Sequence, residues 1–220
     1  VSADIIFNDL KCKLSSAIEN LPEKKNESRK DINGFFFTSK DVARVLLANI
    51  HMYEGNYKEA QPLLEKVIEN GFYSFDATAE EYLTLSNAQK SKELIFGLHN
   101  NNLTNHYDVK EGEIMPYITL SDVYLSLAEC HYKMDNFGIA EQYIKSVTDA
   151  KKLTVIKRDA LLKIKDARED ILLHSGTYFA FLKRTGLAKD ICNIEEYQLL
   201  LPIPRVEMEQ NPFMTQNPGY

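Results

Sequence analysis

ANIHMYEGNYKEA, residues 48–60, has a counterpart 80 residues further along the chain, AECHYKMDNFGIA, residues 128–140. Alanine, histidine, asparagine, an aromatic residue and a second alanine recur at identical spacing. Each segment has the pattern of one helix, a tight turn at the asparagine and a second helix. In tetratricopeptide hairpins, small residues let two helices approach closely and an aromatic ring fills the groove between them. The sequence therefore predicts two such hairpins, which usually build binding surfaces rather than reaction centres.

Apolar residues at helical spacing extend both hairpins. The first is predicted over about 39–70, where Thr38 or Ser39 can cap the first helix and Gly71 follows the second. The second hairpin is predicted over about 118–150.

Further elements are predicted around the hairpins. One helix covers about 4–21, and a long helical region covers about 156–186 with a break near Gly176. The insert between the hairpins, 71–117, interrupts the repeat, and its segment 93–98 has the pattern of a short strand.

The C-terminal tail, 187–220, is rich in proline and is predicted to be irregular, with one helical turn at 205–210. The fold class predicted from these elements is all-α. Tetratricopeptide-like helical hairpins with irregular loops form a single domain, 1–220, and the tail packs across them.

Composition excludes several classes of protein. The chain has 220 residues, of which 44% are hydrophobic and 26% charged, as in ordinary globular proteins. A net charge of −6 without a basic cluster excludes a nucleic-acid binder, because phosphate contacts need a basic face. No stretch approaches ~18 consecutive apolar residues, so no membrane-spanning helix is predicted. The chain opens in helical periodicity without a signal segment, as expected of a stretch that begins inside a longer protein or has lost its leader.

The three cysteines, Cys12, Cys130 and Cys192, are odd in number and widely spaced. This pattern suggests neither a disulfide framework nor a zinc site. Cys130 falls on the apolar face of a repeat helix and is predicted to be buried. A single bridge between two of the three stays open.

No arrangement typical of an enzyme is found. His51 and His131 recur at a repeat position that lies against the partner helix, so packing is the interpretation for both. Neither belongs to an HExxH zinc motif. The glycines are scattered singly, and no nucleophile is paired with a base. The sequence predicts a protein that is not an enzyme and has no cofactor and no metal site.

The tail carries the most specific motif. It reads LPIPRVE at 201–207, NP at 211–212 and QNPGY at 216–220. This closely resembles the C-terminus of the SusD/RagB family of outer-membrane nutrient-binding lipoproteins of Bacteroidetes, where the chain ends on a PIP..E...NP...QNPGY pattern. Other segments resemble family motifs in the same order. They are AIENLP at 17–22, VARVLLA at 42–48, ELIF at 93–96, DVYLSLAE at 122–129 and DAREDIL to LKRTG between 166 and 186.

The resemblance implies a function and a location. It implies non-catalytic capture of a glycan or another nutrient at the cell surface, in an outer-membrane polysaccharide uptake system. The implied partner is a SusC-like TonB-dependent transporter, over which such a protein sits as a lid. The family's attachment to the outer membrane is a lipid anchor on an N-terminal region that has no counterpart in these 220 residues.

Ligand contact is predicted in the insert, at Asn105, His106, Tyr107 and Tyr117. Sugars are bound by flat rings stacked on the pyranose and by amides bonded to the hydroxyls, and this polar loop offers both groups.

Two alternatives to glycan capture stay open. The first is a tetratricopeptide-type scaffold that binds a protein or peptide in its groove. The second is a transporter lid that binds no sugar, which is favoured because the family's loop-rich insert is here reduced to about 99–117.

Overall fold

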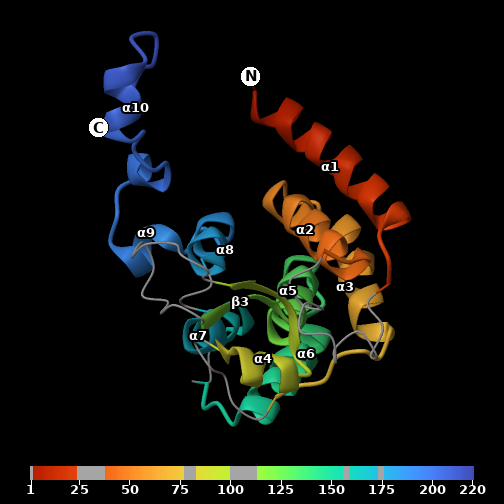
Figure 1. The fold of residues 1–220 in the computed structure, drawn as a ribbon. Coiled ribbons are helices and arrows are strands. Elements are labelled where there is room, and N and C mark those ends of the chain that lie inside the picture. Colours follow the sequence, from red (N-terminus) through yellow and green to blue (C-terminus); the bar gives the residue numbers. More distant parts are fainter. Residues whose placement is uncertain (1, 24–37, 77–82, 100–112, 156–158, 173–175) are drawn as a thin grey trace. The chain divides into compact units, whose positions relative to one another are not determined.

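The computed structural model describes residues 2–23, 38–76, 83–99, 113–155, 159–172 and 176–220. These residues are mostly helical, which confirms the predicted fold class. They form two compact units, 1–176 and 177–220, whose elements are labelled in Figure 1.

The first unit consists of helices and a small sheet. The hairpin helices are α2 (Lys40–Tyr53) with α3 (Tyr57–Glu69), and α5 (Leu120–Lys133) with α6 (Phe137–Lys151). The flanking helices are α1 (Ala3–Asn20) and α7 (Ala160–Leu172). The insert contains β1 (Leu83–Thr84), α4 (Leu85–Lys90), β2 (Leu94–His99) and β3 (Glu113–Thr119).

Both predicted hairpins are present, and their turns share the same backbone hydrogen bond. The amide of Asn56 donates to the carbonyl of His51 at 2.8 Å, and the amide of Asn136 donates to the carbonyl of His131 at 2.8 Å. A residue with left-handed backbone precedes each asparagine, and in the first turn it is Gly55, with φ of +79°. The recurring asparagines therefore mark equivalent turns, as predicted.

The shared alanines are completely buried within the hairpins. Ala48, Ala60, Ala128 and Ala140 have no exposed surface. Because alanine has no side-chain atom beyond Cβ, the two helices of each hairpin can pack closely there, and a larger side chain would force them apart. The recurring alanines therefore lie on buried faces of the hairpin helices, as the repeat pattern predicts.

The helices stack in chain order. α1 packs on α2, α3 packs on α5, and α7 packs on both α5 and α6, in the succession from red to teal in Figure 1. A cluster of buried apolar side chains runs through both hairpins and the sheet, and includes Met52, Leu64, Ile95 and Leu127. The insert therefore belongs to the same core as the hairpins.

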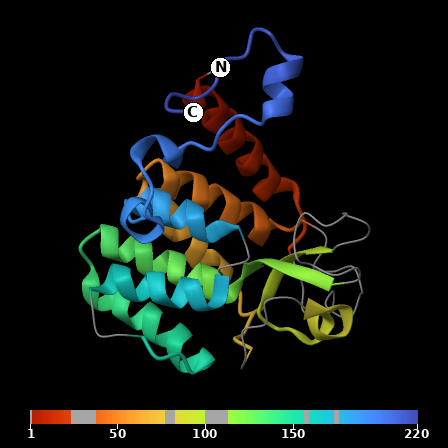
Figure 2. The ribbon, with the colours of Figure 1, turned by 90° about the vertical axis from the view of Figure 1, so that its left-hand side faces the viewer.

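The insert forms a three-stranded antiparallel sheet in the order β1-β3-β2, which Figure 2 shows at one end of the hairpin helices. β2 is the strand predicted at 93–98, whereas β1 and β3 were not predicted. Pro116 argues against β3, because proline has no amide to donate in a central strand. In the described part of the insert, β1 pairs with Glu113 and Ile114 of β3. Within the described residues, Pro116 pairs with Gly97 of β2.

The helical region predicted over 156–186 consists of two helices, α7 and α8 (Thr177–Thr185). Gly176 lies between them with φ of +76°, at the predicted break, and Gly186 follows α8 with φ of +81°. The boundary between the two units falls at the same break.

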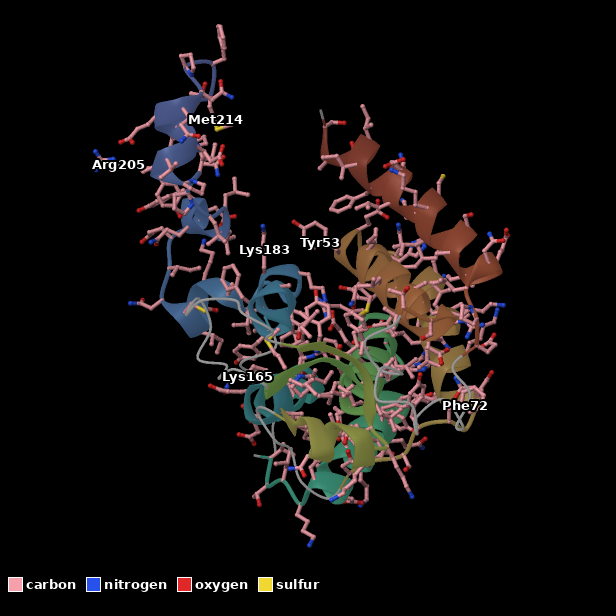
Figure 3. The ribbon with its side chains drawn as sticks, viewed as in Figure 1. Tyr53, Phe72, Lys165, Lys183, Arg205 and Met214 are labelled. Atoms are coloured by element: carbon pink, nitrogen blue, oxygen red, sulfur yellow. The ribbon has the colours of Figure 1, made fainter. Side chains whose placement is uncertain are left out.

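The second unit contains α8, α9 (Ala188–Cys192), the 3-10 helix η3 (Glu196–Leu199) and α10 (Arg205–Gln210). The helical turn predicted at 205–210 is α10, and Figure 3 labels Arg205 at its start and Met214 beyond its end. Helices α9 and η3 were not predicted, because five and four residues are too few to show helical periodicity. Packing of the tail across the hairpins within a single domain, 1–220, stays a prediction.

Side chains of the C-terminal motif form hydrogen bonds with the backbone earlier in the tail. The side chain of Gln216 accepts from the amide of Ile203 at 2.8 Å and donates to the carbonyl of the same residue at 2.9 Å. The hydroxyl of Tyr220 donates to the carbonyl of Leu200 at 2.9 Å. We call residues 197–220 the C-terminal hook.

Replacing Gly219 by alanine should open the C-terminal hook. Gly219 has φ of +97°, and a Cβ atom there would lie 2.4 Å from Cγ of Tyr197. The ring of Tyr197 also packs on Tyr220, with centroids 5.1 Å apart. A left-handed non-glycine residue alone costs about 1–3 kcal/mol. We expect the amide of Ile203 to exchange its hydrogen faster in Gly219→Ala.

Gly138→Ala is the matched control, because Gly138 lies in α6 with no atom within 4 Å of the added Cβ. Alanine in a helix is favoured over glycine by about 0.5–1 kcal/mol. Unchanged exchange of the Ile203 amide in Gly219→Ala would contradict the role given to the motif.

Candidate functional site

The sheet flanks the segment in which ligand contact was predicted. Asn105, His106 and Tyr107 fall outside the described residues. The strand ends on either side are described, and His99 at the end of β2 pairs with Ile114 at the start of β3. The pairing brings the two ends of the intervening segment together at one edge of the insert.

Tyr117, the fourth residue of the predicted site, lies in β3 and is half-buried. Its ring meets the ring of Phe96 in β2 edge to face, with centroids 6.3 Å apart and planes at 81°. Both rings pack against the core cluster. The ring of Tyr117 is therefore held in one orientation while part of it faces solvent. Its contact with a ligand stays a prediction.

Glu93 forms hydrogen bonds that connect the insert to the second hairpin. Its carbonyl accepts from the amide of Leu120 at 3.0 Å, and its carboxylate accepts from the amide of Ser121 at 3.1 Å. The Ser121 hydroxyl and the Lys151 ammonium at the end of α6 also donate to this carboxylate. A negative charge is favoured at the start of α5, where the first-turn amides have no partner within the helix. We call this arrangement the Glu93 clip.

A second buried ion pair joins α5 to α7. Nη1 of Arg168 donates to Oδ1 of Asp122 at 2.6 Å, and Nη2 donates to the hydroxyl of Ser126 at 2.8 Å. The planar guanidinium thus bonds two side chains one turn apart on α5. Neither this pair nor the Glu93 clip was predicted, although Glu93, Asp122 and Arg168 belong to the segments quoted above.

Asp41 joins the start of the first hairpin to its end. Oδ1 accepts from Arg44 at 2.7 Å, and Oδ2 accepts from Asn70 at 2.8 Å and from the hydroxyl of Tyr73 at 3.1 Å. Burial raises the pKa of the Asp41 carboxyl, and the bonds from Arg44 and Tyr73 oppose that rise. Because both oxygens are bonded within the protein, the arrangement suits a structural role rather than proton transfer.

The recurring histidines belong to the hairpin interiors. His131 is buried, and its ring stacks on Tyr143 of α6 with centroids 5.5 Å apart, which confirms the packing interpretation for this residue. Nδ1 of His51 and Nδ1 of His131 are buried and have no hydrogen-bond partner within the described residues. Burial lowers the pKa of His131, and the nearby carboxylate of Glu65 opposes the shift.

Acidification should destabilise the fold through His131. Its pKa in the folded protein is below the ordinary value of 6.5, so the unfolded chain binds the proton first. This contribution to stability is complete above pH 6.5 and is lost as the pH falls through the folded pKa. Tyr143 stacks on the ring, and the carboxylate of Glu65 interacts with it electrostatically. We expect the free energy of unfolding, measured in urea, to fall more between pH 7 and pH 5 in the wild type than in His131→Phe. Equal slopes would contradict this assignment.

The cysteines and the acidic side chains form no reactive cluster in the described ranges. Cys12 and Cys192 are exposed, Cys130 is buried as predicted, and all three are free thiols. Within the described ranges no group of three or more His, Cys, Asp or Glu side chains is placed to hold a metal ion. Helices in the same ranges are too short or too polar to cross a bilayer.

A pocket of about 320 Å³ lies between α6 and α7. Lys163 donates to Glu141 across it at 2.6 Å, and Lys145 is paired with Asp149 on α6. This volume is at the lower end of ligand sites, and the charged groups named here are already paired. The pocket therefore offers no clear binding chemistry.

Of three comparisons with known proteins, the comparison with solved structures finds matches. No family model matches the sequence, and no curated protein matches it. A SusD superfamily protein from Bacteroides vulgatus is 19% identical, with 97% of this chain and 65% of that protein covered, at a TM-score of 0.67. A SusD-like protein from Bacteroides fragilis is 13% identical, with 100% and 72% covered, at a TM-score of 0.73. Surface glycan-binding protein A from Bacteroides thetaiotaomicron, in complex with laminarihexaose, is 15% identical, with 99% and 71% covered, at a TM-score of 0.74.

The TM-scores of 0.67, 0.73 and 0.74 show a shared fold over nearly the whole chain. The chain spans 65% of the length of the first of these proteins and 72% of the second. The likeness is to the superfamily that the C-terminal motif indicated, and it confirms that resemblance.

Proposed function

We propose that this chain, which has the fold of the SusD superfamily, is a SusD/RagB-type protein that captures a glycan without breaking a bond in it. The observation that carries the proposal is the likeness over 99% of the chain to a surface glycan-binding protein solved with laminarihexaose. The stacked hairpins supply a rigid support, and the buried acidic groups Glu93, Asp122 and Asp41 are engaged in bonds that hold helices together. A scaffold of this kind suits binding rather than proton transfer.

We place the glycan site in the insert, at Asn105, His106, Tyr107 and Tyr117. Amide and imidazole groups bond hydroxyls, and tyrosine rings stack on the apolar face of a sugar. The half-exposed ring of Tyr117, held by Phe96 on the same strand pair, supports this placement.

The proposed location is the outer-membrane surface, with a SusC-like TonB-dependent transporter as partner. A lipid anchor on polypeptide outside these 220 residues would hold the protein there. The C-terminal motif and the fold support this part of the proposal.

A glycan array that includes laminarihexaose tests the proposal, followed by calorimetric titration of the best ligand. We expect Tyr117→Ala and Tyr107→Ala each to weaken binding about fivefold, since one stacked ring contributes about 1 kcal/mol. Tyr132→Ala is the matched control, because Tyr132 lies near the far end of α5, where its ring packs on Phe137.

Equal losses in Tyr117→Ala and Tyr132→Ala would contradict the placement of the site. A chain that binds no glycan but retains the transporter in a pull-down would be a lid only. A chain that binds neither, and instead holds a peptide in its groove, would be an interaction scaffold.

A further inference from the structure

The carboxylate of Glu93, which is 4% exposed, accepts hydrogen bonds from three separate parts of the chain. Oε1 accepts from the amide of Ser121 at 3.1 Å and from the hydroxyl of the same residue. Oε2 accepts from the ammonium of Lys151 and, at 3.0 Å, from the amide of Asp76. Each oxygen therefore serves two donors, and the two oxygens serve different segments.

The Glu93 clip lies at the root of the β2–β3 strand pair. β2 begins at Leu94, directly after Glu93, and β3 ends at Thr119, directly before Leu120. Leu94 and Thr119 pair with each other. The bond from the Leu120 amide to the Glu93 carbonyl, at 3.0 Å, therefore extends the strand pairing by one step. The carboxylate joins the same end of the strand pair to the first turn of α5.

The strand pair is irregular at Tyr117. The pairing shifts between Leu94 and Phe96 and again between Phe96 and Gly97, and the second shift passes over Tyr117. A bulge of this kind bends the strand and re-aims the side chain at the irregularity. The direction of the Tyr117 ring therefore depends on where along the strand pair the shift falls.

The apolar pattern of β2 does not fix this place. Alternation of buried and exposed residues sets the register of a strand that has one buried face. In β2 the neighbours Leu94 and Ile95 are both buried, with exposed fractions of 3% and 0%, so alternation does not distinguish the two faces. A contact outside the strand pair must then hold the register, and the Glu93 clip is the contact at its root.

We propose that Glu93 is a positioning residue of the glycan site, which fixes the register of β2 against β3 and thereby aims the ring of Tyr117. In the observed register this ring meets Phe96 edge to face. Glu93 acts through Tyr117 and does not itself touch the sugar. The inference rests on the proposed function, because it assigns a role in the contact between Tyr117 and a glycan.

Glu93→Gln tests the inference with little change in shape. Glutamine has one accepting oxygen where the carboxylate has two, so one pair of donors loses its acceptor. We expect the oxygen to face the Lys151 ammonium, because a charged donor forms the stronger bond, and the amide of Ser121 is then left unpaired. Fluorine NMR of the chain labelled with 3-fluorotyrosine, without sugar, should show the Tyr117 resonance displaced or broadened. Tyr117→Phe assigns that resonance.

Asp122→Asn is the matched control. Asp122 follows Ser121 directly, is 3% exposed and forms the other buried ion pair, with Arg168. The substitution removes a buried carboxylate of the same kind but leaves the bonds at the root of the strand pair in place. We expect an unchanged Tyr117 resonance, because a loss of stability alone does not move a resonance of the folded state. Urea unfolding measures the stability of both variants.

Glu93→Asp is the second variant, for the case that Glu93→Gln does not fold. It keeps the negative charge beside Lys151 but is shorter by one methylene group, so its carboxylate cannot reach Lys151 and Ser121 together. We expect the Tyr117 resonance to be displaced in this variant as well.

Calorimetric titration with laminarihexaose connects the position of the ring to binding. Glu93→Gln should weaken binding up to about fivefold, the loss expected of Tyr117→Ala, because a displaced ring no longer contributes its stacking of about 1 kcal/mol. Glu93→Gln combined with Tyr117→Ala should bind as Tyr117→Ala does, because the effect of Glu93 passes through this ring.

An unchanged Tyr117 resonance in Glu93→Gln and Glu93→Asp would overturn the inference, as would an equal displacement in Asp122→Asn. Losses of affinity that add in the double variant would also overturn it. A wild type that binds neither laminarihexaose nor any other glycan of the array would overturn the proposed function. The two failures are distinguishable, because the fluorine spectra report the position of the ring without sugar.

Discussion

Replacing Lys151 by methionine is expected to lower the free energy of unfolding by about 3–5 kcal/mol, the cost of leaving a buried charge without its partner. The Lys151 ammonium donates to the Glu93 carboxylate and, at 3.0 Å, to the carbonyl of Asp76. The side chains of Lys151 and Glu93 are only 3% and 5% exposed, so water cannot replace the ammonium. Urea unfolding followed by circular dichroism at pH 7 measures the loss.

Two further variants distinguish the effect of the unpaired buried charge on stability from the effect of replacing a lysine side chain. Lys145→Met removes an exposed lysine from the same helix, where it pairs with Asp149, and should change stability by less than about 1 kcal/mol. Glu93→Gln combined with Lys151→Met removes both charges and should recover part of the loss. If Lys151→Met lost no more stability than Lys145→Met, the Glu93 clip would not hold the insert.

Arg168→Met is expected to have a similar effect, about 3–5 kcal/mol, and to release α7 from α5. The substitution removes the cation from Asp122 and a donor from the hydroxyl of Ser126, both inside the helix interface. We expect the amides of α7 to exchange hydrogen faster by a larger factor than those of α3, because α3 does not share this bond. Hydrogen exchange resolved by peptide, together with urea unfolding, measures both effects.

Arg205→Met is the matched control, because the side chain of Arg205 is 90% exposed and pairs with Glu209 along its own helix. Such a pair contributes about 0.3–0.5 kcal/mol. Asp122→Asn combined with Arg168→Met should regain part of the stability. Identical protection of α7 in the wild type and Arg168→Met would show that apolar contacts alone hold this helix.

The hairpins could be predicted because their signal is local. Recurring alanines, asparagines at the turns and apolar residues at helical spacing all lie within one hairpin of about 30 residues, where periodicity can be read from the sequence. The same holds for the helical turn at 205–210. Strand β3 could not be predicted, because Pro116 argues against a strand and the pairing of β3 with β2 cannot be read from the sequence. Pairing with β2, a contact between separate segments of the chain, stabilises β3 as a strand.

The buried ion pairs could not be predicted for a related reason. Lys151 and Glu93 are 58 positions apart, and Arg168 and Asp122 are 46 apart. Sequence spacing gives no reason to pair one acidic or basic residue with another over such distances. The motif segments did contain Glu93, Asp122 and Arg168, which is the signal that a search for partners could have used.

Of the predicted site, Tyr117 can be located in the structure, on the strand pair that flanks the other three residues. The sequence indicated a polar, aromatic loop because asparagine, histidine and tyrosine cluster there. It did not indicate that Phe96 would fix the ring of Tyr117, since the pairing of β2 with β3 brings them together.

Incubation of the chain with its best array ligand, followed by equilibrium dialysis and mass spectrometry of the recovered oligosaccharide, tests the central claim most directly. The account predicts saturable retention of the oligosaccharide and recovery of its full length after prolonged incubation. Retention of none of the glycans offered, or recovery of shortened products, would contradict it.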